Sequence, residues 1–130
     1  MLITSDDPVV AVAAIPALMA EGHDSLKELA LRMTEGECGA LLVRQRDGEL
    51  AIVTERDIVR SLALGDAGAA GWATDIMTRD VISVRPTASI SDVASLMIEA
   101  GVRHVVVRDD ENDRVGVASM RDLIEPLLSS

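Results

Sequence analysis

Residues 51–58 read AIVTERDI, and residues 116–123 read GVASMRDL, 65 positions further along the 130-residue chain. Each stretch opens with small and β-branched residues typical of a buried strand, and then places a hydroxyl residue and an acid three positions apart. These two residues are Thr54 and Asp57 in the first stretch and Ser119 and Asp122 in the second. Because this spacing is typical of a helix start, both stretches predict a strand that turns directly into a helix.

The similarity extends upstream of these stretches. Residues 25–33 (SLKELALRM) align with residues 89–97 (SISDVASLM), and residues 40–44 align with residues 104–108, both at an offset of 64. The offset changes to 65 in a polar turn, where a single insertion is tolerated best. Each half therefore predicts the order helix, strand, strand, helix, in a duplicated unit that buries its apolar face against its neighbour.

The expected elements follow from capping residues and from the spacing of apolar residues. Helices begin after the N-caps Ser25 and Ser89, and closing helices span 55–64 and 120–128. Strands are expected at 40–43, 50–53, 81–84, 105–107 and 115–118, with a short lead strand near 17–20. Thr74 is expected to cap a short helical turn, and the pattern of residues 8–15 leaves strand and helix equally open.

A glycine-rich connector at residues 65–71 separates the halves. We therefore divide the chain into a first repeat with its N-terminal lead segment (1–64), a connector (65–73) and a second repeat (74–130).

Composition restricts the classes of function. Hydrophobic residues make up 48% of the chain, which excludes a disordered protein. A net charge of −10 with no Phe or Tyr argues against binding to nucleic acid or to an anionic membrane surface. The one cysteine, Cys38, and the lack of a signal-peptide pattern or a bilayer-length apolar run predict a cytoplasmic protein.

Four stretches carry a resemblance to a known family: residues 53–58 (VTERDI), 76–84 (IMTRDVISV), 101–107 (GVRHVVV) and 116–123. In this order the chain resembles a tandem pair of cystathionine-β-synthase (CBS) domains, a Bateman-type module. The resemblance implies an α/β (α+β) fold of two β-α-β-β-α repeats packed about a pseudo-two-fold axis, with two clefts. In this family the clefts often hold adenine nucleotides or S-adenosylmethionine, and pairs commonly form homodimers that pass ligand occupancy to a partner.

The resemblance also implies site residues. One cleft would combine Thr54, Arg56 and Asp57 with Thr78, Val81, Val102, Arg103 and His104. The other would combine Ser119, Arg121 and Asp122 with Met19, Cys38, Gly39 and Ala40. Because the first cleft holds cationic residues from both repeats, we expect the stronger anion affinity there.

The chemistry of these positions supports two interpretations. A hydroxyl and free N–H groups at a helix start suit a phosphate, and an acid one turn later suits the hydroxyls of a ribose. The same residues also form an ordinary capping box, and the two roles are compatible. Arg103 and His104 also have two interpretations. The alternative to ligand binding is a solvent-facing residue at the start of a strand for Arg103, and a residue that only packs against its neighbours for His104.

Two departures from the family pattern count against binding. Ala51 stands where the second repeat has Gly116, and its methyl group is expected to crowd a ligand. Glu21 and Asp24 are expected to add negative charge beside the second cleft. Elsewhere, we expect the acidic run 109–113 to be a solvated hairpin tip and Trp72 to pack the connector or to lie at a dimer interface. The methionines expected to fill the core are Met19, Met33, Met77 and Met97.

The sequence therefore predicts a regulatory ligand-sensing module that binds AMP, ADP, ATP or S-adenosylmethionine and acts on a protein partner. It predicts no catalysis, no metal and no required cofactor, because no nucleophile–base pair, ligand cluster or phosphate loop occurs. The alternative is an interaction or scaffold module of the same fold with degenerate clefts that bind nothing.

Overall fold

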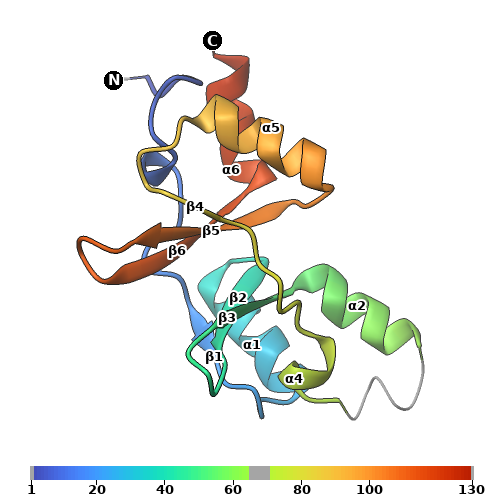
Figure 1. Ribbon diagram of the computed structural model, residues 1–130. Helices are drawn as coiled ribbons and strands as arrows, with labels where there is room; N and C mark the ends of the chain where they lie inside the picture. The colour runs from blue at the N-terminus through green and yellow to red at the C-terminus, as the bar shows by residue number, and fades with distance from the viewer. Residues whose placement is uncertain (1, 65–70, 130) are drawn as a thin grey trace. The chain divides into compact units, whose positions relative to one another are not determined.

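The computed structural model describes residues 2–64 and 71–129, so most of the expected connector lies outside the described residues. These residues form two compact units. We call residues 18–81 the first-repeat unit, and residues 1–17 together with 82–130 the second-repeat unit. Figure 1 labels the elements of each. The units do not coincide with the sequence repeats, because the N-terminal segment belongs with the second repeat.

The first-repeat unit places two helices against a three-stranded sheet. Strand β1 lies parallel to β2, and β2 lies antiparallel to β3. Its elements are β1 (Met19–Ala20), α1 (Leu26–Gly36), β2 (Ala40–Arg44), β3 (Leu50–Thr54), α2 (Glu55–Ala63) and α4 (Ala73–Ile76). The core joins Leu29 and Met33 of α1 to Val43 and Val53 of the sheet. These side chains are at most 5% exposed. The burial of Leu29 and Met33 agrees with the helical spacing of the apolar residues.

The second-repeat unit repeats this arrangement in the order β4-β5-β6. Its elements are the 3-10 turn η1 (Val9–Ala11), β4 (Ser83–Val84), α5 (Ile90–Ala100), β5 (His104–Asp109), β6 (Arg114–Ser119) and α6 (Met120–Leu128). Val9 is fully buried and joins Met97, Val107 and Leu123 in the core. The predicted α/β class with two copies of one unit is confirmed.

Each sheet is extended by a segment that precedes the other repeat in sequence. Thr78 forms an isolated antiparallel bridge with Ile52 of β3, with N–H to O distances of 2.8 and 2.9 Å. Ala14 forms the corresponding bridge with Val117 of β6, with two distances of 2.9 Å. Since Ala14 and Thr78 are 64 positions apart, the duplication includes these lead segments.

Several local expectations need correction. The N-cap of α4 is Trp72, not Thr74, because the Asp75 carboxylate accepts the Trp72 N–H at 2.8 Å. The strand expected at 81–84 forms only over Ser83–Val84. Residues 8–15, left open between strand and helix, hold the 3-10 turn and the bridge of Ala14.

Candidate functional site

The end of β3 turns into α2 through a reciprocal set of hydrogen bonds. Thr54 Oγ1 accepts the Asp57 N–H at 3.3 Å, and Asp57 Oδ2 accepts the Thr54 N–H at 2.9 Å and the Thr54 hydroxyl at 3.0 Å. Both residues are half-buried. Among the described residues, no group donates to Asp57 Oδ1, so this oxygen is available to accept a hydroxyl from a ligand.

The end of β6 has the same geometry. Ser119 Oγ accepts the Asp122 N–H at 3.2 Å, and Asp122 Oδ2 accepts the Ser119 N–H at 2.8 Å. The capping-box interpretation is therefore confirmed at both junctions, and helix α1 shows that such a box also forms away from the end of a strand. There Ser25 and Glu28 form the same pair of bonds, and no strand runs directly into the helix.

The start of β2 lies beside the first junction. Gly39 O accepts the Glu55 N–H at 2.9 Å, and Ala40 is paired with Thr54 across the sheet. The bridge to Ile52 brings Thr78 to the neighbouring edge of β3. The unit thus brings together Thr54, Asp57 and Thr78, which were predicted to share a cleft. Of the remaining predicted residues here, Arg56 is exposed and Val81 is half-buried.

Arg103 and His104 hold the corresponding place at the second junction. Arg103 O accepts the Met120 N–H at 2.8 Å, and His104 is paired with Ser119. Arg103 is exposed and His104 half-buried, and Val102 packs against the core of the unit. Within one unit, then, these residues accompany Ser119 and Asp122. Their predicted association with Thr54 stays a prediction, because Thr54 belongs to the other unit.

A groove of about 500 Å³ contains two of the predicted residues. Its walls belong wholly to the second-repeat unit and consist of Leu2, Ile3, Val12, Arg121, Asp122, Glu125 and Pro126. The three apolar residues from the N-terminal segment were missed by sequence reasoning. The signal available was the 64-residue offset, which relates this segment to residues 66–81.

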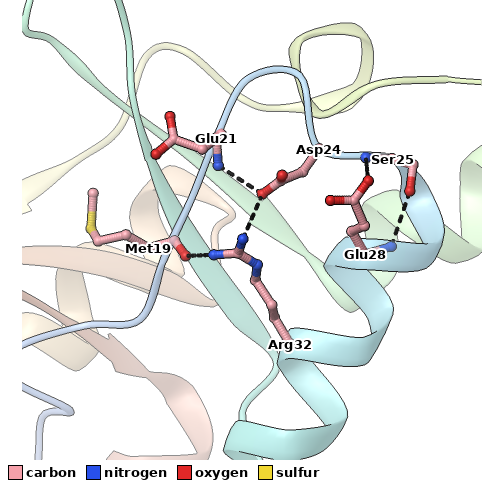
Figure 2. A network of polar contacts seen from close by, with 6 residues as sticks. All are labelled: Met19, Glu21, Asp24, Ser25, Glu28 and Arg32. Carbon is pink, nitrogen blue, oxygen red and sulfur yellow. Dashed lines mark hydrogen bonds and ion pairs between the residues drawn. The ribbon is translucent and has the colours of Figure 1, made fainter.

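The charge expected from Asp24 beside the second cleft is largely compensated (Figure 2). Asp24 is only 3% exposed, and its Oδ2 accepts the Glu21 N–H at 2.8 Å and lies 3.4 Å from Arg32 Nη2. Arg32 also donates to Met19 O at 2.9 Å. Of the two acids, Glu21 alone has an exposed side chain, so the expectation was wrong for Asp24.

The crowding expected from Ala51 is also corrected. Ala51 is fully buried and belongs to the apolar core of the first-repeat unit. At the equivalent place in β6, a Cβ on Gly116 would lie 2.6 Å from Ala14 O and 2.7 Å from Ile15 Cβ. Glycine is therefore required in the second repeat by the close approach of the N-terminal segment.

The acidic run after β5 is only partly a solvated tip. Asp109 is 6% exposed, and its Oδ2 accepts the Asn112 side-chain amide and the Arg114 Nε–H, both at 2.9 Å. The amide of Asn112, followed by the guanidinium of Arg114, lowers the pKa of Asp109 below its ordinary value of 3.8. The carboxylate therefore fixes the hairpin.

The remaining expectations concern single residues. Met33 and Met97 are buried core residues as predicted, while Met19 and Met77 are half-buried. Cys38 is a half-buried free thiol that packs against the core. Trp72 is 51% exposed, so most of its surface does not pack against the unit. Within residues 2–64 and 71–129, no helix is long and apolar enough to cross a membrane, and no three metal-ligating side chains gather.

Two units of one sheet and two main helices, each with a hydroxyl–acid pair where a strand becomes a helix, define a tandem repeat module. The chain belongs to the CBS domain family, whose profile matches residues 9–64 and again residues 73–129.

Three relatives illustrate this likeness. The uncharacterized protein MK0525 of Methanopyrus kandleri is 31% identical over 105 residues, which is 78% of this chain and 54% of that protein. The chain thus spans about half of that relative's length. A conserved protein from Pyrococcus horikoshii has the same fold at 22% identity, with a TM-score of 0.80 over 95% of this chain and 93% of that one. The CBS domain pair of protein MJ0100 is 26% identical, with a TM-score of 0.77 over 90% of this chain and 96% of that one. That structure is a complex with 5-methylthioadenosine and S-adenosyl-L-methionine.

Proposed function

We propose that this chain is a regulatory module that binds an adenosine-containing ligand at its strand-to-helix junctions and passes occupancy to a protein partner. The observation that carries the proposal is the pair of capping boxes placed directly at the ends of β3 and β6. In each, one carboxylate oxygen accepts the backbone N–H and the other faces no described donor. That second oxygen suits a ribose hydroxyl, as the resemblance to the family implies.

The ligand class is supported by a relative whose structure was determined with bound ligands, the MJ0100 pair. The MJ0100 pair binds two adenosine derivatives, one of which carries a formal positive charge and neither of which carries a phosphate. A related site in this chain would hold the adenosine part through the junction. Arg103, Arg121 and Arg56, which are exposed around the junctions, would favour a nucleotide with phosphate groups. We therefore propose AMP, ADP or ATP ahead of S-adenosylmethionine.

A thermal-shift series tests this proposal. At about 100 times its dissociation constant, a ligand adds about 2.7 kcal/mol to the free energy of unfolding, which raises Tm by several degrees. We expect such a rise with one adenine nucleotide, and we expect Asp57→Ala together with Asp122→Ala to abolish it.

The matched control is Glu28→Ala, which removes the same capping bond from α1 away from the junctions. We expect Glu28→Ala to lower the free energy of unfolding by no more than about 1 kcal/mol, because it removes one exposed hydrogen bond, and to leave the ligand-dependent rise in Tm intact. Equal ligand responses in the junction variant and the wild type would contradict the proposed site. No response to any nucleotide or to S-adenosylmethionine would favour the scaffold alternative.

We also propose that the module is a homodimer. Each unit leaves large apolar side chains exposed on its helices: Leu31, Val59 and Leu62 in the first-repeat unit, and Ile98, Ile124 and Leu128 in the second. Val59 and Leu62 are 65% and 56% exposed on α2, which neighbours α1. A second copy of the chain would remove such side chains from water.

Leu62→Glu is expected to convert the dimer to a monomer, because the interface would bury an unpaired carboxylate. Sedimentation equilibrium measures the mass directly. The control is Arg60→Gln, which neutralises an exposed charge on the same helix. We expect this variant to stay dimeric. A monomeric wild type at all concentrations would contradict the homodimer.

A further inference from the structure

A second cavity lies in the first-repeat unit, at the opposite end of the sheet from the Thr54 junction. Its volume is about 720 Å³, which is within the range of small-molecule sites. It is lined by Glu21, Gly22, His23, Val43, Arg44, Gln45, Arg46, Asp47, Trp72, Thr74, Met77 and Arg79. These residues come from the loop after β1, the end of β2 with the turn that follows it, and the segment around α4, so the cavity is formed within one unit.

Three arginines at this cavity have no carboxylate partner. Arg44, Arg46 and Arg79 form no ion pair within the described part of the chain, although the sequence holds 22 acids and 12 basic residues. Arg32, by contrast, pairs with Asp24. Only Arg32 and Arg114 form ion pairs in the described part of the chain, so what distinguishes these three arginines is that they line one cavity on a chain with a net charge of −10.

One of the three arginines is held in place. Arg79 Nη1 donates to Gln45 Oε1 and Nη2 donates to Thr74 O, both at 3.0 Å. A guanidinium group carries five N–H donors, so these two bonds fix its plane and leave donors for a ligand. Arg44 makes one long bond, from Nη1 to Gly48 O at 3.4 Å, and Arg46 is exposed in the turn.

The other parts of the wall define the ligand further. Trp72 is 51% exposed, which leaves its ring available to contact a planar group. Two acids, Glu21 and Asp47, also line the cavity, and Asp47 Oδ1 already accepts the Glu49 N–H at 2.9 Å. Three guanidinium groups and two carboxylates give the wall a net charge of +1, which favours an anion over a cation.

The residues that line this cavity differ from those of the Thr54 junction, although Arg79 directly follows Thr78, which is bridged to Ile52 of β3. Strand β3 runs from Leu50, next to the turn that lines the cavity, to Thr54 at the junction. At about 3.3 Å per residue, the ends of this strand are roughly 13 Å apart. Whether one nucleotide occupies both places is therefore tested by removing the Asp57 and Asp122 carboxylates.

From these observations we infer that the first-repeat unit holds a second site, formed by Arg44, Arg46, Arg79 and Trp72, for a phosphorylated molecule with a planar ring. Arginine forks match the oxygens of a phosphate group, and the exposed indole covers the ring. The inference goes beyond the proposed function, because it concerns a different set of residues and can hold when the junctions bind nothing.

Trp72 is the only tryptophan of the chain, and there is no tyrosine, so its fluorescence reports on this cavity. The experiment titrates the full chain with ATP while recording Trp72 emission, and repeats this with adenosine. We expect a saturable change with ATP and a much weaker response to adenosine, which lacks the phosphate groups. We expect Arg46→Gln with Arg79→Gln to raise the dissociation constant at least tenfold.

Arg60→Gln, which removes one exposed charge from α2, is the matched control and is expected to leave the titration unchanged. Arg46→Gln alone provides a variant that breaks no described hydrogen bond, in case loss of the Arg79 bonds unfolds the turn. The Asp57→Ala, Asp122→Ala variant separates the two sites: an unchanged Trp72 response in it supports the second site. The inference is overturned if that variant abolishes the Trp72 response, if adenosine binds as tightly as ATP, or if the arginine variants bind ATP normally.

Discussion

Leu123→Ala is expected to lower the free energy of unfolding by about 2–5 kcal/mol, the largest single effect anticipated in this chain. Leu123 is fully buried in α6, one residue after Asp122, and it packs with Val9, Met97 and Val107. Removing three methyl-sized groups leaves a cavity that α5 and the N-terminal segment cannot fill without moving. Urea unfolding followed by far-UV circular dichroism measures the change in midpoint.

The neighbouring Ile124 provides the control, because it is 49% exposed on the same helix. In the Leu62→Glu background, where the proposed dimer is absent, Ile124→Ala removes the same number of carbon atoms as Leu123→Ala, and we expect the free energy of unfolding to fall by no more than about 0.5 kcal/mol. If both variants unfolded at the same urea concentration, α6 would not be anchored through Leu123. The pair therefore tests whether the helix that carries Asp122 is fixed by the apolar core.

The main elements could be predicted from the sequence because they depend on local signals. Ser25 and Ser89 cap α1 and α5 as expected, and the two strand-to-helix junctions follow from three-residue spacings. The repeat itself was visible because apolar residues recur at the same places in both halves. Local chemistry and the duplicated pattern agree here, which is what makes the assignment possible.

The positions that sequence reasoning missed depend on contacts between distant residues. No local signal pairs Ala14 with Val117, so the place of the N-terminal segment beside β6 was not predicted. The sequence alone predicts that Asp24 is a surface acid. The structure places Arg32, two helical turns away, beside it. The same holds for the arginines around Trp72, which come from two separate segments, with Arg44 and Arg46 in one and Arg79 in the other.

A second large loss of stability is expected for Gly116→Ala, where the N-terminal segment lies against β6. The new Cβ would lie 2.6 Å from Ala14 O, a backbone atom that is itself held by the Val117 bridge. The strand or the N-terminal segment must therefore shift, and overpacking of this kind costs about 1–3 kcal/mol. We expect a lower urea midpoint and faster exchange of the Ala14 and Val117 amide protons, because their mutual hydrogen bonds would be strained.

Gly39→Ala is the matched control for this prediction. A Cβ at Gly39 would meet the Glu55 side chain at 3.4 Å, an ordinary contact with a flexible group, so we expect little change in stability. Ala51→Gly completes the comparison, since it places glycine at the first-repeat equivalent of Gly116 and costs about 0.5–1 kcal/mol from strand entropy. Should Gly116→Ala unfold like Gly39→Ala, the N-terminal segment would not be tied to β6. The groove that Leu2, Ile3 and Val12 form with Asp122 would then be no fixed part of the second junction.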